Sequence, residues 1–229
     1  MIMNKNVKIG IGIAVLIFLA VAGYSWYNES NKPAEDDKFI KTVERNLSTA
    51  DRKIFEDRLV EAQNKLTASK TDEERFGWQM QIGYNLQALG RLGQAQDAFE
   101  QAIRLKSDDY SGLTALFQVQ IDRSDNEGAL VSIKTALDKS PNNPDLWRKY
   151  IQLETEKFNP SNDSLNNLYL EALSKTNDSV NIITVYAQFL EKVGEVTKSI
   201  EYWQKAIDAN PASKKLYQTE IDRINKLLK

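Results

Sequence analysis

The chain has 229 residues, of which 41% are hydrophobic and 27% are charged, a balance typical of a protein that folds in water. It contains no histidine and no cysteine, which excludes disulfides, thiol nucleophiles, Ser-His-Asp triads and metal sites built on sulfur or imidazole. The chain has 30 Lys and Arg residues and 32 Asp and Glu residues. The resulting net charge of -2 gives no general electrostatic basis for binding nucleic acid.

The first predicted element is a membrane-spanning helix over residues 9–27. This segment has no charged side chain, and at about 1.5 Å per residue its helix nearly crosses a hydrocarbon core about 30 Å thick. Lys5 and Lys8 precede it, so we expect residues 1–8 in the cytoplasm and the rest of the chain outside it, in a single-pass protein of the cell membrane. A signal peptide cleaved after Ala22 is the alternative, because Ala20-Val21-Ala22 has the small-x-small form of a peptidase site.

Residues 28–37 are polar and are expected to form a tether. Residues 38–75 carry two apolar stripes at helical spacing, one before Ser48 and a longer one after Ser48 as its N-cap. The stripe before Ser48 consists of Phe39, Ile40, Val43 and Leu47. We expect this region to be either a pair of capping helices or a degenerate repeat.

From residue 76 onward the sequence repeats itself. Alanine recurs at Ala102, Ala136, Ala172 and Ala206, and three positions earlier stand Phe99, Ile133, Tyr169 and Trp203. The period gives four units, 76–109, 110–143, 144–179 and 180–213, each with two amphipathic helices. Turn residues fall between the two helices of each unit: Gly90 and Gly93, Ser124 to Gly128, Asn159-Pro160-Ser161-Asn162, and Gly194. The third unit is two residues longer, and we expect both residues in its turn.

This pattern resembles the tetratricopeptide repeat. Ile82-Gly83, Ala95, Phe99 and Ala102 of the first unit match the family's Leu-Gly pair and its later Ala-x-x-x-Phe and Ala positions. The resemblance implies an all-α fold, in which the N-terminal transmembrane helix is followed by a right-handed solenoid of helix pairs. Residues 214–229 would cap it, with Leu216, Ile221, Ile224 and Leu228 on one side. The third unit departs from the pattern, because Leu165 occupies a position that is usually small.

No catalytic motif is present. We find neither a phosphate-binding loop nor a nucleophile elbow, and we expect no catalytic residue, no metal, no cofactor and no small-molecule substrate. A hydrolase that uses carboxylates alone is a remote alternative, since nothing pairs an acid with a base.

The resemblance also implies where a partner binds, because the first helices of tetratricopeptide units line a concave groove that receives a protein or peptide. The expected groove residues are Met80, Tyr84, Thr114, Gln118, Arg148, Gln152 and Gln188. Tyr84 and the three glutamines share the ninth position of their units, where an amide could pair with the backbone of an extended ligand. Alternatively, glutamine is simply a good helix former on a solvated face.

The sequence therefore predicts a membrane-anchored scaffold that binds a protein or peptide and no nucleic acid. It is similar to small bacterial membrane-anchored repeat proteins, which implies a role in envelope protein assembly or secretion. The alternative is a secreted or periplasmic binding module released by cleavage after Ala22.

Overall fold

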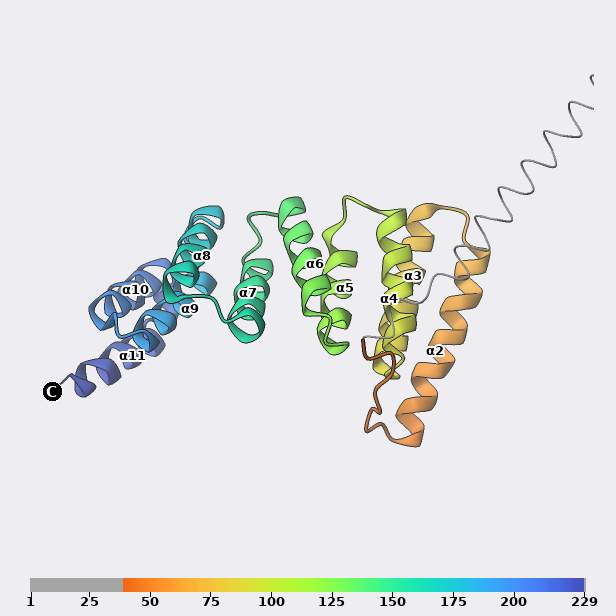
Figure 1. The fold of residues 1–229 in the computed structure, drawn as a ribbon, viewed down its shortest axis with the longest axis horizontal. Coiled ribbons are helices and arrows are strands. Elements are labelled where there is room, and N and C mark those ends of the chain that lie inside the picture. Colours follow the sequence, from red (N-terminus) through yellow and green to blue (C-terminus); the bar gives the residue numbers. More distant parts are fainter. Residues whose placement is uncertain (1–38, 229) are drawn as a thin grey trace, which may run out of the picture. The chain divides into compact units, whose positions relative to one another are not determined.

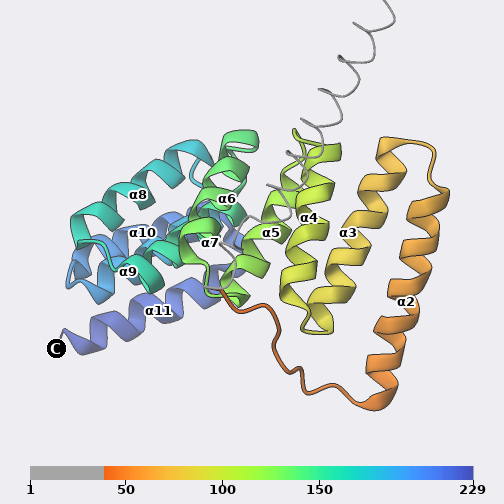
Figure 2. The same ribbon diagram turned by 45° about the vertical axis from the view of Figure 1, so that its right-hand side comes forward.

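Helices make up most of residues 39–228, the part of the chain that the computed structural model describes, and no strand occurs within that range. Figures 1 and 2 show the helices following one another in sequence order. They are α2 (Thr49–Ala68), α3 (Asp72–Ala88), α4 (Leu92–Leu105), α5 (Tyr110–Asp122), α6 (Asn126–Lys139), α7 (Pro144–Leu153), the π-helix η2 (Glu154–Phe158), α8 (Asn162–Lys175), α9 (Val180–Lys192), α10 (Val196–Ala209), the 3-10 helix η3 (Pro211–Ser213) and α11 (Lys214–Leu227).

The predicted transmembrane helix at 9–27 and the tether at 28–37 lie outside the described residues. Within 39–228, none of the helices combines the length and the apolar character that crossing a bilayer requires. The domain boundaries assigned from the sequence stay predictions.

The repeated alanines and the large residues that precede them form the core. Ala102, Ala136, Ala172 and Ala206 have no exposed surface, and each large residue three positions earlier is at most 8% exposed. Alanine lets two helices approach closely, while the larger side chain fills the space beside it. Gly83 shows the same principle, because a Cβ added there would collide with the ring of Phe99.

The four predicted turns each contain one residue in the left-handed region. These are Gly90 (φ 77°), Ser124 (φ 63°), Asn159 (φ 47°) and Gly194 (φ 87°). A left-handed residue ends a helix by turning the chain back, so the turn signals in the sequence are confirmed.

The third unit accommodates its two extra residues differently from the prediction. Its left-handed Asn159 is the sixteenth residue of the unit, whereas Gly90, Ser124 and Gly194 are the fifteenth of theirs. One extra residue therefore lies in η2, where the Asn159 amide bonds to the Glu154 carbonyl five residues back. Only the second lengthens the turn, because a one-residue insertion within a helix is absorbed by a π-helical turn.

Leu165 leaves the helix pair of the third unit open. A pocket of about 260 Å³ lies between α7, η2 and α8, and Leu165 lines it together with Tyr150 and Leu168. A large side chain at a position that is usually small holds the helices apart.

Residues 40–48 are extended, so the helix suggested by the apolar stripe before Ser48 is wrong. The Ile40 amide donates to the Arg123 carbonyl (3.1 Å) and the Val43 amide to the Gly90 carbonyl (2.9 Å), while the Gly93 amide donates to Lys41 (2.9 Å). The segment runs along the turn ends of α3, α4 and α5 (Figure 2). Nine residues are too few to form a stable helix alone, and these partners satisfy the backbone instead. Among the described residues, α2 consequently has no preceding helix to pair with.

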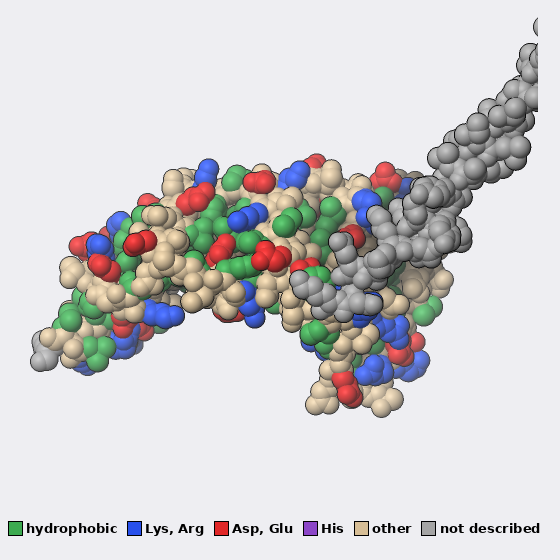
Figure 3. Space-filling view, viewed as in Figure 1, with side chains coloured by type: hydrophobic (Ala, Val, Ile, Leu, Met, Phe, Trp, Pro, Cys, Tyr) green, Lys and Arg blue, Asp and Glu red, His purple; other side chains and the backbone are tan. Residues whose placement is uncertain are grey.

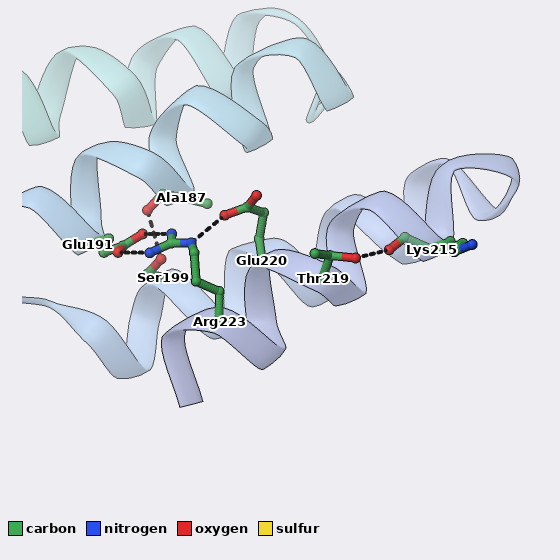
Figure 4. A network of polar contacts seen from close by, with 7 residues as sticks. All are labelled: Ala187, Glu191, Ser199, Lys215, Thr219, Glu220 and Arg223. Atoms are coloured by element: carbon green, nitrogen blue, oxygen red, sulfur yellow. Dashed lines mark hydrogen bonds and ion pairs between the residues drawn. The ribbon is translucent and has the colours of Figure 1, made fainter. Parts of the chain in front are cut away.

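The last helix is tied to the repeat before it by a polar network. The Arg223 guanidinium donates two hydrogen bonds to the Glu191 carboxylate (2.8 and 2.7 Å) and one to Glu220 (2.9 Å), as Figure 4 shows. The apolar side of α11 differs from the predicted one. Tyr217, Ile221 and Ile224 are buried, whereas Leu216 and Leu228 are 63% and 61% exposed.

Candidate functional site: a groove along the first helices

Three pockets lie along the first helices of the second, third and fourth units, and together they form what we call the groove. The α5 pocket (about 120 Å³) lies between α5, α7 and η2, the middle pocket (about 230 Å³) borders α7, η2 and α9, and the α9 pocket (about 350 Å³) follows η2 and α9. The first two share Gln152 and Glu156, and the last two share Thr155, Tyr169 and Val185. The three pockets are therefore adjacent.

Four of the seven predicted groove residues line these pockets. Gln118 borders the α5 pocket, Arg148 the middle pocket and Gln188 the α9 pocket, while Gln152 borders both the α5 and the middle pocket. All four side chains are exposed. The structure thus brings these four together on one surface, although their role in binding stays a prediction.

The remaining three residues lie elsewhere. Met80 is only 7% exposed and belongs to the core with Leu59 and Ala62 of α2, so the expectation that it faces a groove is wrong. Thr114 is half-buried, and its hydroxyl donates to the Tyr110 carbonyl (3.0 Å). Tyr84 is 47% exposed on α3, with its ring set edgewise against Phe99 at 5.2 Å between centroids.

Two groove glutamines are oriented by carboxylates one helical turn further on. Gln118 Nε2 donates to Asp122 (3.3 Å) and Gln152 Nε2 to Glu156 (2.8 Å). The same arrangement occurs on α10 and α11, where Gln204 donates to Asp208 and Gln218 to Asp222. Helix stabilisation alone can therefore explain these pairs. Their amide oxygens nonetheless accept no hydrogen bond from any described residue and are free for a ligand donor.

One of the three residues shared by the middle and α9 pockets, Tyr169, belongs to a cluster of aromatic rings. Tyr169, 8% exposed, stacks on Tyr186 at 5.2 Å and lies 5.0 Å from Phe189 between ring centroids. Burial raises the pKa of Tyr169, and burial followed by the nearby Tyr202 and Glu195 raises the pKa of Tyr186 to about 12. Both phenols therefore stay protonated at neutral pH, and this cluster is uncharged.

Cations outnumber carboxylates among the residues that line the groove. Lys149 and Lys157 border the α5 pocket, Arg148 the middle pocket and Lys192 the α9 pocket, against the single carboxylate of Glu156. Acidic and basic side chains are interspersed over the face drawn in Figure 3. The excess of cations holds for the residues that line the three pockets.

Sequence reasoning missed several groove residues, above all those of η2. Thr155 and Glu156 line two pockets each, and Lys157 lines the α5 pocket. The only signal in the sequence was the 36-residue length of the third unit, which reveals an insertion but not its place. Within residues 39–228, no three carboxylates gather into a cluster that could hold a metal ion.

Comparison with known proteins supports this fold. Residues 79–109 match the family described as tetratricopeptide repeat. Similar solved structures include MamA (TM-score 0.55, 14% identity, 75% of this chain and 99% of that one). They also include a tetratricopeptide repeat protein from Parabacteroides merdae (0.52, 17%, 66% and 60%) and pilF of Pseudomonas aeruginosa (0.51, 16%, 67% and 68%). No curated protein matches the chain. At such identities the likeness concerns the fold.

Proposed function

We propose that this chain, which matches the tetratricopeptide repeat over residues 79–109, is a scaffold that binds a protein or peptide partner in the groove along α5, α7, η2 and α9. The observation that carries the proposal is that three pockets, linked by shared lining residues, follow one another across three successive units. Each pocket combines apolar wall atoms with exposed polar side chains, and a segment of polypeptide needs both.

The lining suits an extended chain in particular. Gln118, Gln152 and Gln188 stand at the same position of successive units, and two of them present an unused amide oxygen. An extended ligand carries backbone N–H groups that can donate to such oxygens, without any requirement for charge.

The proposal includes an anchor in the cell membrane at residues 9–27, with the repeats outside the cytoplasm. Its support comes from the sequence: an uncharged stretch of spanning length after Lys5 and Lys8. A scaffold in that position would serve envelope protein assembly or secretion. Mass spectrometry of the membrane fraction tests the anchor. An N-terminus at Met1 supports it, and a soluble product that begins at Gly23 would favour the cleaved binding module instead.

Site-specific photocrosslinking tests the binding site. A photoreactive residue is placed at Gln118, Gln152 or Gln188, and as a matched control at Gln204, which is an exposed glutamine on the second helix α10. The proposal predicts one common adduct from the three groove positions and none of that mass from Gln204. An adduct from Gln204 alone, or no adduct from any groove position, would refute it.

A further inference from the structure

The middle and α9 pockets together form a trough between α7, η2 and α9 that has an uncharged centre and a cation at each end. Tyr169, Val185 and Thr155 line both pockets and therefore mark the centre. Arg148 lines only the middle pocket, and Lys192 lines only the α9 pocket. The trough thus has an uncharged centre with one cation on either side of it, and Glu156 of the middle pocket is the one carboxylate in its lining.

The two cations are available to a ligand. Both side chains are exposed. Arg148 has one ion pair, to Asp145 at 3.8 Å, in which both side chains are more than half exposed, so water competes strongly with it. No carboxylate among residues 39–228 lies within ion-pair distance of the Lys192 ammonium.

The spacing between these cations fits an extended peptide. Arg148 is the fifth residue of its unit and Lys192 the thirteenth of the next, an offset of eight helical positions, or about 12 Å along the axis. They stand on the neighbouring helices α7 and α9, whose axes lie about 8–10 Å apart, so their backbones are separated by about 15 Å. An extended chain advances about 3.3 Å per residue and spans about 13 Å from residue i to i+4, and the long side chains of Arg148 and Lys192 reach across the remainder. Since alternate side chains of such a chain point the same way, residues i, i+2 and i+4 face the trough together.

The π-helix η2 contributes two residues, Thr155 and Glu156, that make the two sides of the trough different. Glu156 is the one carboxylate in the lining, and Gln152 Nε2 holds it at 2.8 Å on the side of the trough that also borders the α5 pocket. The Thr155 hydroxyl, which lines the centre, donates to the Ile151 carbonyl (2.7 Å), so its proton is already used within the protein. The centre thus favours an aliphatic or aromatic side chain over a polar one.

On the basis of the proposed function, we infer that the trough binds an extended segment with the pattern acidic-x-apolar-x-acidic. The apolar side chain packs on Tyr169 and Val185, one acidic side chain pairs with Arg148, and the other pairs with Lys192. The partner is therefore a protein that exposes such a segment, and its charge complements a groove that is locally positive on a chain of net charge -2.

Synthetic peptides test the inference by fluorescence anisotropy with the full-length chain in mild detergent. The test peptide carries Glu-Ser-Leu-Ser-Glu between neutral flanks. A second peptide of the same composition, with the order Glu-Ser-Ser-Leu-Glu, moves the leucine to the opposite face. A third replaces both glutamates by lysine. The test peptide is expected to bind most tightly of the three, and its affinity is expected to fall as salt rises.

Charge reversal in the protein locates the site. Arg148→Glu and Lys192→Glu are each expected to weaken binding of the test peptide about tenfold in low salt, because each turns an attraction into a repulsion. Lys215→Glu reverses an exposed charge on α11 and serves as the control, with no change expected. The double variant Arg148→Glu/Lys192→Glu is expected to bind the lysine peptide instead. Far-UV circular dichroism confirms that each variant is folded.

Equal binding of the three peptides, an equal loss in the Lys215→Glu variant, or no binding of the test peptide would overturn the inference. The proposed function is judged separately by photocrosslinking from Gln152. A common groove adduct without binding of the acidic peptide would refute only the ligand pattern, whereas failure of both experiments would refute both.

Discussion

Replacing Gly90 by alanine tests whether the extended segment at 40–48 belongs to the fold. A Cβ at this position would collide with the Val43 carbonyl oxygen and lie 3.1 Å from the Val43 carbonyl carbon. Gly194 is the equivalent residue of the last unit, with a similar φ of 87° against 77°, but a Cβ there meets nothing within 4 Å. The two substitutions therefore share a backbone cost and differ in the contact with the segment.

The magnitudes follow from that difference. Alanine in the left-handed region costs about 1–2 kcal/mol relative to glycine, so we expect Gly194→Ala to lower the free energy of unfolding by that amount. Gly90→Ala adds the steric conflict and the hydrogen bond from the Val43 amide to the Gly90 carbonyl, which is worth about 1 kcal/mol. We expect a total loss of about 2–4 kcal/mol. If residues 40–48 detach to relieve the collision, the extra loss in the free energy of unfolding cannot exceed what their packing contributes.

Two measurements on the full-length chain in mild detergent check this prediction. Urea unfolding followed by circular dichroism gives the free-energy difference between the variants. Hydrogen exchange reports the segment directly, because the amides of Ile40 and Val43 are hydrogen-bonded and should exchange faster in Gly90→Ala but not in Gly194→Ala. Equal destabilisation by the two substitutions, with unchanged exchange at both amides, would refute the packing described for residues 40–48.

Other predictions concern the core and the last helix. Gly83→Ala should lower the free energy of unfolding by about 1–3 kcal/mol, because the Cβ overlaps the fully buried ring of Phe99; Gly77→Ala on the same helix, with nothing within 4 Å, should raise it by about 0.5–1 kcal/mol. Opposite signs in urea unfolding are the expected result, and a loss for both would contradict the packing argument. Arg223 lowers the pKa of Glu191, so this pair stabilises the fold above the ordinary carboxylate pKa of 4.5, and its contribution is lost as the pH falls through the lowered value. Arg223→Ala should therefore reduce the urea midpoint at pH 7, and the difference from wild type should shrink below pH 4.5; a difference independent of pH would contradict the role of the ion pair.

The repeat and its core could be predicted because the determinants are local and recur. A buried alanine with a large apolar residue three positions earlier recurs at a nearly constant period, and this pattern determines how the helix pairs pack. The turns followed from glycine, asparagine and serine at fixed places, since only a few residues tolerate the left-handed region. The constant period also places equivalent positions of successive units on one side, and four of the expected groove residues therefore lie together on one surface.

The errors concern contacts between residues that are distant in the sequence. The stripe through Ile40 and Val43 fits a helix, but the partners that hold it extended are Gly90 and Arg123, which no local pattern reveals. Met80 occupies the position of Arg148 in its own unit, yet α2 packs on α3 and the side chain enters their shared core. The π-helical turn depends on where an inserted residue costs least, and the sequence gives only the length of the unit.

Side-chain footprinting of the complex tests the central claim most directly. With the partner identified by crosslinking from Gln152, hydroxyl-radical labelling is compared for the free and the bound chain. We predict protection of Ile121 and Val185, which line the α5 pocket and the trough. Val131 and Leu170, which are 67% and 43% exposed on the second helices α6 and α8, should be labelled equally in both states. Protection of Val131 and Leu170 with unchanged labelling of Ile121 and Val185 would place the partner on the opposite helices and contradict the account.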